Sequence, residues 1–238
     1  RRPFPELDRA RWDELAARSP WATPFSRWAF HRAWWDGYGE GASDASLAVV
    51  DDAGRLVGIV PLMRRHEVEP SDLARATALR HTPDVETTQV AGTATALFFG
   101  ASYHADYATL LAAPDDLAAV AEAVAEHVAA LGRDETTADA WEALDLRRLR
   151  CGDPAADALA AAFLRREAHA GWTLNVERED VCPVRVIEDG LDFEGYLDTL
   201  GKKERHEIRR KVRRAEAAGE VRLVPSADPL ADLDAFVE

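Results

Sequence analysis

The spacing of hydrophobic and polar residues predicts a succession of helices and a hairpin in the first part of the chain. An apolar stripe over residues 7–20 has a helical period, and Asp8 stands where an N-cap is expected. Residues 23–39 continue as a second helix that ends at two glycines. Within residues 46–65, two β-rich runs enclose an Asp-Asp-Ala-Gly sequence, which predicts a β-hairpin.

The rest of the pattern alternates between helical and extended periods. Residues 113–131 form the clearest amphipathic helix, and residues 153–171 predict another with Asp153 as its cap. Further strands are expected over residues 86–90, 96–99, 141–149, 172–179, 182–187 and 220–225, and further helices over 191–200, 200–219 and from Pro229 onward. This alternation predicts an α/β (α+β) fold, in which a mixed sheet is flanked by helices, and a change of unit near Gly190.

Composition narrows the class of protein. The chain has 238 residues, of which 47% are hydrophobic and seven are Trp, so it can bury a sizeable core. Its 43 acidic and 29 basic residues give a net charge of −14, which argues against a general attraction to nucleic acid or to anionic membranes. Any binding of anions must therefore be local.

Several other features bear on location and completeness. No apolar run is long enough to span a bilayer, and the N-terminus has no secretory pattern. Cys151 and Cys182 occur in unrelated contexts, so we expect reduced core thiols in a cytoplasmic protein. The histidines lack ligand spacing, so no metal site is expected. The chain begins without Met and ends within a developing helical pattern, so we expect it to be a piece of a longer protein.

One strongly basic helix interrupts this acidic chain. Residues 202–216 contain eight Lys or Arg residues and three Glu residues. Arg205 and Arg209 are four residues apart and share one helix face, which Arg213 extends by another turn. The helix either braces an acidic part of the protein or forms a local anion site, for which the guanidinium fork is well suited.

A polar cluster follows the expected strand at residues 96–99. Tyr103, His104, Asp106 and Tyr107 lie within five positions. Such a cluster at the end of a strand can hold a general base or bind a substrate amine. The alternative is a polar loop in which Tyr107 packs against the core.

The aromatic residues of the second helix also allow two interpretations. They are Phe25, Trp28, Phe30, Trp34 and Trp35. They could form a platform on which a ligand stacks. Their helical spacing favours a buried core face instead, because large aromatic side chains mostly serve burial.

Residues 89–94 match the Q-x-x-G-x-A loop with which acetyl-CoA-binding transferases hold a pyrophosphate on backbone N–H groups. That mechanism requires a strand before the loop and an amphipathic helix after it. Because the residues that follow have no helical period, we interpret the match as a coincidence.

Four segments together resemble a known family. They read TPFSRWAFHRAWWDGYG, DAGRLVGIVPL, HADYATLL and YLDTLGKKERHEIRRKVRRAEAAGEVRL, in that order. The order resembles the GNAT-related acetyltransferases associated with cellulose biosynthesis (CelD-like), which are similar to the Fem-type aminoacyl transferases of peptidoglycan assembly. The resemblance covers essentially the whole chain. It implies a tandem pair of GNAT-like folds with an acceptor cleft between them, with residues 1–190 as the first fold and residues 191–238 as the truncated beginning of the second.

The resemblance also implies roles for individual residues. An Arg of the K-x-R-x-x-I-R helix, here Arg205 or Arg209, would contact a substrate diphosphate. Asp106 would lie near the acceptor as the catalytic candidate. The family has a phosphate-binding Lys after its Trp-rich helix, where this chain offers only Arg32. The acyl-CoA-binding half of the second fold would lie largely beyond Glu238.

The implied activity is transfer of an acyl group, acetyl from acetyl-CoA or another acyl-CoA, to an amine or hydroxyl of a cell-envelope or polysaccharide precursor. Direct attack on the thioester needs positioning and a base, with no covalent nucleophile on the protein. The residues expected to bind substrate are Lys202, Arg205, Arg209, Arg213, Tyr103, Tyr107 and Arg32. Two alternatives stay open: an aminoacyl transferase that uses charged tRNA, and a non-catalytic GNAT-like scaffold that binds a partner.

Overall fold

The computed structural model describes residues 4–65, 95–133, 140–176, 178, 181–222, 224–228 and 230–237. The chain divides into two compact units, Arg1–Val181 and Cys182–Glu238, whereas the sequence pattern places a change of unit at Gly190. The expected strand at residues 86–90, the Q-x-x-G-x-A match and Pro229 lie outside the described residues.

The sequence predicts a helix in each place where the first unit has one, although the second begins at Trp28 and not at residue 23. The helices are α1 (Arg9–Arg18), α2 (Trp28–Tyr38), α3 (Leu117–Arg133) and α4 (Pro154–Ala170), preceded by the short 3-10 helices η1 (Phe4–Glu6) and η2 (Pro24–Ser26). Asp8 caps α1 by accepting a hydrogen bond from the Arg11 N–H at 2.9 Å. Asp153 caps α4 through the Ala155 N–H, also at 2.9 Å. Both caps satisfy backbone donors that a helix start leaves without partners.

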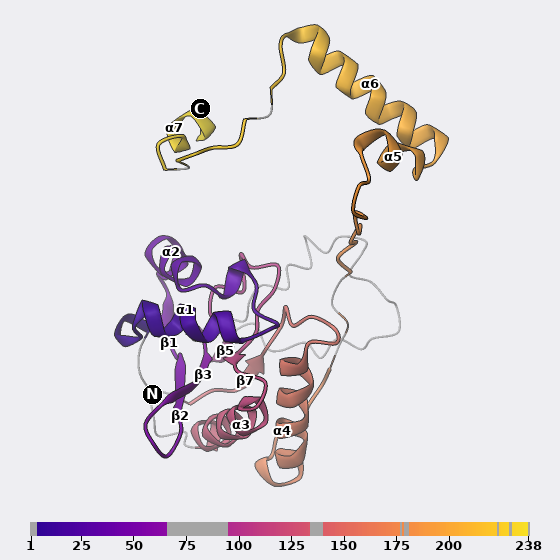
Figure 1. Ribbon diagram of the computed structural model, residues 1–238. Coiled ribbons are helices and arrows are strands. Elements are labelled where there is room, and N and C mark those ends of the chain that lie inside the picture. The colour runs from indigo at the N-terminus through magenta and orange to yellow at the C-terminus, as the bar shows by residue number, and fades with distance from the viewer. Residues whose placement is uncertain are drawn as a thin grey trace. The chain divides into compact units, whose positions relative to one another are not determined.

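The strands of this unit form two sheets (Figure 1). They are β1 (Ala42–Asp44), β2 (Leu47–Val50), β3 (Leu56–Val60), β4 (Leu62–Arg65), β5 (Ala96–Phe99), β6 (Leu111–Ala112) and β7 (Ala143–Asp145). One sheet has the order β1-β4-β5-β7 and the other β2-β3-β6. The pair β5–β7 is parallel and the other pairs are antiparallel, so the predicted mixed sheet and the β2–β3 hairpin are confirmed.

Pro61 stands between the two sheets. On one side the pairing continues past it in a single register, with a hydrogen bond from the Ala45 N–H to the Leu62 carbonyl at 2.9 Å. On the other side the Gly100 N–H donates to the Pro61 carbonyl at 2.9 Å, and pairing resumes only in β6. Residues 101–109 therefore leave the ladder as an excursion between β5 and β6. Proline cannot donate to a ladder, which is why regular pairing breaks here.

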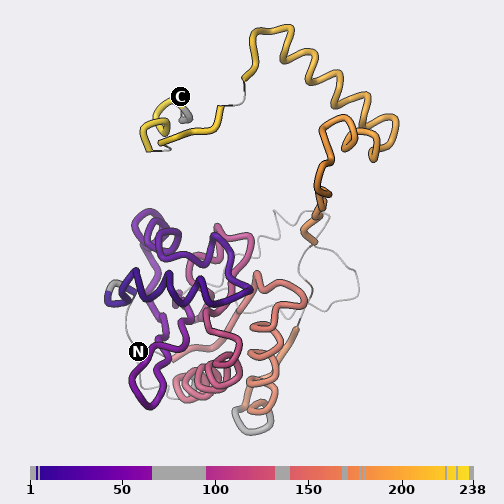
Figure 2. The backbone as a smooth tube through the Cα atoms, viewed as in Figure 1, coloured from indigo at the N-terminus to yellow at the C-terminus, as the bar shows by residue number. Residues whose placement is uncertain are grey.

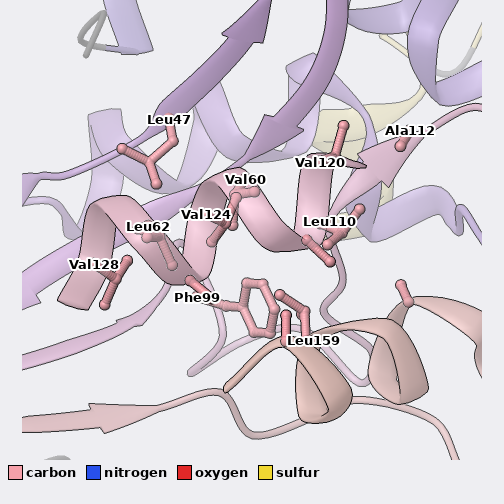
Figure 3. Close-up of a cluster of buried hydrophobic side chains, with 14 of the residues drawn as sticks. Leu47, Val60, Leu62, Phe99, Leu110, Ala112, Val120, Val124, Val128 and Leu159 are labelled. Carbon is pink, nitrogen blue, oxygen red and sulfur yellow. The ribbon is translucent and has the colours of Figure 1, made fainter. Parts of the chain in front are cut away.

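Successive side chains of each strand point to opposite faces of its sheet, so that a hydrophobic cluster lies on each face. Leu62 and Phe99 belong to the cluster formed with α3 and α4, whereas Met63 and Phe98 belong to a cluster that includes Trp34 of α2. Figure 3 shows the first cluster, in which Leu47, Val60, Leu62, Phe99, Leu110, Val120, Val124, Val128 and Leu159 lie together. The period of two thus buries both faces under helices, as layered α/β domains require.

The aromatic residues of α2 serve burial, as their spacing predicts. Trp34 is 3% exposed, and Trp28 and Trp35 pack against buried residues of the neighbouring clusters. The two cysteines contradict their expected place in the core. Cys151 lies in a turn and Cys182 in an extended segment, and both are exposed free thiols.

The second unit consists of three helices joined by extended segments, which Figure 2 traces. They are α5 (Phe193–Asp198), α6 (Lys202–Ala218) and α7 (Leu233–Val237). Each was expected from the sequence, and Gly219 ends the basic helix α6 as predicted. Across the described residues, no helix combines the length and the apolar character that crossing a bilayer requires.

Three expected strands are wrong within the described residues. Residues 172–179, 182–187 and 220–225 show no ladder pairing there, although their apolar residues alternate. Val184 and Val186 are 80% and 73% exposed, so their alternation buries no face. A period of two becomes a strand only where a neighbouring strand completes its backbone hydrogen bonds, and no strand of the described residues does so for these segments.

A close contact between β3 and α3 gives a test of this packing. A Cβ atom on Gly58 would lie 2.6 Å from Val120 Cγ1. Gly58→Ala should therefore lower the free energy of unfolding by about 1–3 kcal/mol, the range for overpacking a core. The double variant with Val120→Ala should cost less than the sum of the two single changes, because the second removes the colliding methyl groups. Chemical denaturation measures all three, and strictly additive costs would contradict the contact.

Candidate functional site

The excursion of residues 101–109 is anchored, although it leaves the sheet. Ala101 and Ser102 are fully buried, and Ala105 and Ala108 are at most 9% exposed. Ala101 has φ 62°, a left-handed conformation that costs an L-residue free energy. Burial of neighbouring residues holds the backbone in this conformation. The excursion is thus a packed loop in which His104 and Asp106 are the exposed residues.

A second strained residue lies against the same loop. Arg148 has φ 72°, and its carbonyl accepts a hydrogen bond from the Ala108 N–H at 3.0 Å. Within the residues that the structure describes, Ala101 and Arg148 are the two non-glycine residues with positive φ. Strained backbone persists where surrounding structure enforces it and is concentrated at functional sites. The excursion is therefore the best-supported location for a site in the first unit.

His104 of the excursion is held by two aromatic residues of α2. The Trp34 indole N–H donates to His104 Nδ1 at 3.0 Å. The Tyr38 ring stacks on the imidazole with a centroid distance of 4.2 Å and an interplanar angle of 26°. Because an indole can only donate, Nδ1 must be unprotonated, and the neutral ring carries its proton on Nε2. The exposed imidazole is thus fixed in orientation and in tautomer.

Asp106 is the exposed carboxylate of the loop. It follows the buried Ala105, and the described part of the chain provides it with no hydrogen bond or ion pair. A carboxylate of this kind is free to bind an ammonium group or to accept a proton. The sequence-based candidate therefore lies on a fixed backbone with an uncommitted side chain.

Both candidate tyrosines of the loop make cation–π contacts. The Arg65 guanidinium lies 5.0 Å from the centroid of the Tyr103 ring. The Arg150 guanidinium lies 5.6 Å from the centroid of the Tyr107 ring. Tyr107 also meets Phe25 edge-on, in line with a packed ring. These contacts place positive charge beside the loop and fix the two rings.

His31 was missed by the sequence interpretation. It lies in the aromatic stripe of α2 and is 4% exposed. Burial lowers its pKa to about 4, and a hydrogen bond with the Phe25 backbone opposes this shift. The only signal in the sequence is its position among Trp and Phe residues on one helix face. A histidine there is a buried, neutral ring.

Arg32 does not join this group. It pairs with Asp36 one helical turn later, at 2.7 Å, on the exposed face of α2. Such an exposed pair contributes little to stability. The phosphate-binding role suggested for Arg32 stays a prediction.

The basic helix α6 uses part of its charge internally. Arg205 donates to Asp198 at 2.8 Å, and Arg209 pairs with Glu194, so both arginines reach α5. Their spacing of four residues brings them to the same neighbour. In the second unit these two arginines therefore brace α5 against α6. Their expected place in an acceptor cleft with Asp106 stays a prediction.

Other cations of α6 are not used in this way. Lys202, Lys203, Arg213 and Arg214 are exposed and have no ion pair with any described residue. Arg210 and Lys211 instead share Glu207 on the same helix. Its hydrogen bonds to Arg210 lower the pKa of Glu207. The helix therefore combines an internal brace with uncommitted positive charge at both ends.

An acyl-CoA pyrophosphate would be poorly bound at the starts of α1, α3 and α4. It requires free N–H groups or cations at a helix start. The N-termini of α1 and α4 are capped by Asp8 and Asp153, and Asp115 and Asp116 precede α3. These carboxylates would repel the pyrophosphate. Among the described side chains, no three His, Cys, Asp or Glu residues come together in a cluster that could hold a metal ion.

Comparisons with protein-family models, with curated proteins and with solved structures find no match. The mixed α/β architecture is thus established by the structure itself. The GNAT-like assignment depends on the sequence motifs and stays an expectation.

The buried His31 makes stability depend on pH. Below the ordinary histidine pKa of 6.5, the unfolded chain takes up a proton that the folded chain refuses until about pH 4. The contribution of His31 to the free energy of unfolding is therefore complete above pH 6.5. It should fall by about 3 kcal/mol as the pH drops from 6.5 to 4. Denaturant titrations across this range measure the loss.

His31→Gln should remove this part of the pH dependence, because glutamine does not titrate. His206→Gln, on an exposed position of α6, serves as the matched control. Burial raises the pKa of Asp153, so this group makes the folded state more stable as the pH falls, which opposes the effect of His31. Because Asp153 acts equally in the wild type and in both variants, the test is the difference between their profiles of unfolding free energy against pH. Parallel profiles for wild type and His31→Gln would show that His31 is not buried.

Proposed function

We propose that this chain is part of an acyltransferase that transfers an acyl group, acetyl from acetyl-CoA, to an amine or hydroxyl of a cell-envelope or polysaccharide precursor. The observation that carries the proposal is the exposed carboxylate of Asp106, which has no hydrogen bond or ion pair with the described residues. It lies on a loop whose backbone is strained at Ala101 and whose alanines are buried. The family resemblance supplies the reaction type, and acetyl-CoA supplies the activated thioester. The mixed sheet and the division of the chain after Val181 support a first GNAT-like unit followed by the opening of a second.

The loop residues serve the acceptor. Asp106 attracts the ammonium form of an amine acceptor and takes the proton whose loss frees the nitrogen lone pair, or takes the proton of an acceptor hydroxyl. The nitrogen or oxygen then bonds to the acyl carbon while the C–S bond of the thioester breaks, and the departing CoA thiolate takes up the remaining proton and leaves as the thiol. His104, held by Trp34 with its Nε2–H directed away from that bond, offers a hydrogen-bond donor to an acceptor hydroxyl. Tyr103 and Tyr107 contribute fixed aromatic surface on the same loop.

The basic helix offers a site for a phosphate within the second unit. Lys202 and Arg213 have no ion pair with a described residue, so they can bind a phosphate without first breaking a protein contact. Arg205 and Arg209 must release Asp198 and Glu194 to do the same, at little cost because both pairs are exposed. Free, exposed thiols at Cys151 and Cys182 support a reducing, cytoplasmic location.

The uncommitted cations also favour one alternative, an aminoacyl transferase that uses charged tRNA. Lys202, Lys203, Arg213 and Arg214 would then contact RNA phosphates. Binding of tRNA to the full-length protein should weaken steeply between 50 and 200 mM salt in that case. Arg213→Ala should reduce the salt slope, whereas Asp52→Asn should leave it unchanged. Absence of tRNA binding at low salt would eliminate this alternative.

The acyl-transfer proposal predicts that Asp106→Asn lowers kcat for an amine acceptor by about 10²–10⁴-fold, the contribution of a positioned base. Release of CoA thiol from acetyl-CoA, measured on the full-length protein with a panel of amino sugars and polyols, reports the rate. Asp52→Asn removes an equal charge in the exposed turn between β2 and β3 and is the matched control.

The control should keep the wild-type kcat, and both variants should keep the wild-type melting temperature. Equal activities of Asp106→Asn and wild type would exclude Asp106 as the base. Absence of CoA release with every acceptor would contradict the proposed reaction itself.

A further inference from the structure

A small cavity lies between α2 and the excursion. Its volume is about 10 Å³, the lower end of what one water molecule requires. Its lining includes His31, Pro61 and Gly100 together with three hydroxyl-bearing residues, Ser26, Tyr107 and Thr109. Polar groups therefore form part of the lining, which distinguishes this cavity from the apolar voids of a core.

One nitrogen of the lining has no hydrogen bond. His31 Nδ1 is buried and has no partner within the described part of the chain. A Cβ atom on Gly100 would lie 3.6 Å from Nδ1, so this nitrogen faces the Gly100 side of the cavity. A buried polar atom without a partner costs about 1–3 kcal/mol, and native structures leave few of them.

The chemistry of the ring defines what can bind. The ring makes a hydrogen bond with the Phe25 backbone, and because Nδ1 has no partner this bond uses the other nitrogen. A neutral imidazole that donates through Nε2 presents Nδ1 as an acceptor. The missing partner must therefore be a small donor, and the cavity volume limits it to one or two heavy atoms.

We propose that this cavity binds one water molecule. The water donates a hydrogen bond to His31 Nδ1 and makes a second hydrogen bond with the hydroxyl group of Ser26 or Thr109. The water joins α2 to the excursion that carries Asp106. The proposal is independent of the acyltransferase function, because it depends only on the cavity and on His31.

Gly100→Ala tests the site without changing His31. Gly100 has no left-handed φ, and the added methyl would meet His31 Nδ1 and Pro61 at 3.6 Å, an ordinary van der Waals distance. If a water occupies the cavity, the methyl displaces it and leaves Nδ1 without a donor, so the melting temperature should fall by about 2–8 °C. If the cavity is dry, the same methyl fills a void, and the melting temperature should stay unchanged or rise.

Gly37→Ala is the matched control, since a Cβ atom there meets nothing within 4 Å. It should not lower the melting temperature. A Gly100→Ala variant as stable as this control would overturn the proposal.

Water–protein NOEs on the wild-type chain provide a measurement that needs no variant. The proposal predicts a long-lived water contact to His31 Hε1 or to the Ala105 methyl group, and its loss in Gly100→Ala. Absence of the contact in the wild type, or its persistence in Gly100→Ala, would contradict the site.

Discussion

The structure of the first unit depends on the missing N–H of Pro61. Without this donor, the extended stretch made of β3 and β4 cannot keep regular antiparallel pairing along both of its edges. Towards β1 and β2 the register survives, with the Ala45 N–H bonded to the Leu62 carbonyl. Towards β5 and β6 the last bond is from Gly100 to the Pro61 carbonyl, and the chain then departs as residues 101–109. One imino acid thus divides the sheet and creates the loop that carries the candidate site.

The loop keeps its shape because other elements enclose it. Its alanines are buried, and the strained backbone at Ala101 persists under that packing. The Trp34 hydrogen bond fixes His104, and the Arg148 carbonyl fixes Ala108. Asp106 alone among the acidic and basic side chains of the loop is left uncommitted within the described residues. This combination of a fixed backbone and a free carboxylate is what a general base requires.

Much of the fold could be predicted from the sequence, because its signals are local. The caps at Asp8 and Asp153 and the amphipathic period of α3 each depend on neighbouring residues alone. Strands at residues 182–187 and 220–225 could not be decided in this way, since a strand needs a partner distant in sequence. The candidate cluster after β5 was found from its composition. The position of this cluster on an excursion depends on the long-range strand pairing around Pro61, and so does the burial of His31 beside it. The sequence pattern does not reveal such pairing.

We propose that the excursion at residues 101–109 binds an amine acceptor through Asp106. Titration of the isotope-labelled full-length protein with glucosamine, followed by backbone NMR shifts, tests it most directly. N-acetylglucosamine is the matched neutral ligand. Glucosamine should shift the resonances of residues 101–109 most strongly and the neutral ligand should shift them much less, because the attraction is between the ammonium and the carboxylate. Equal shifts for the two ligands, or shifts confined to other parts of the protein, would contradict it.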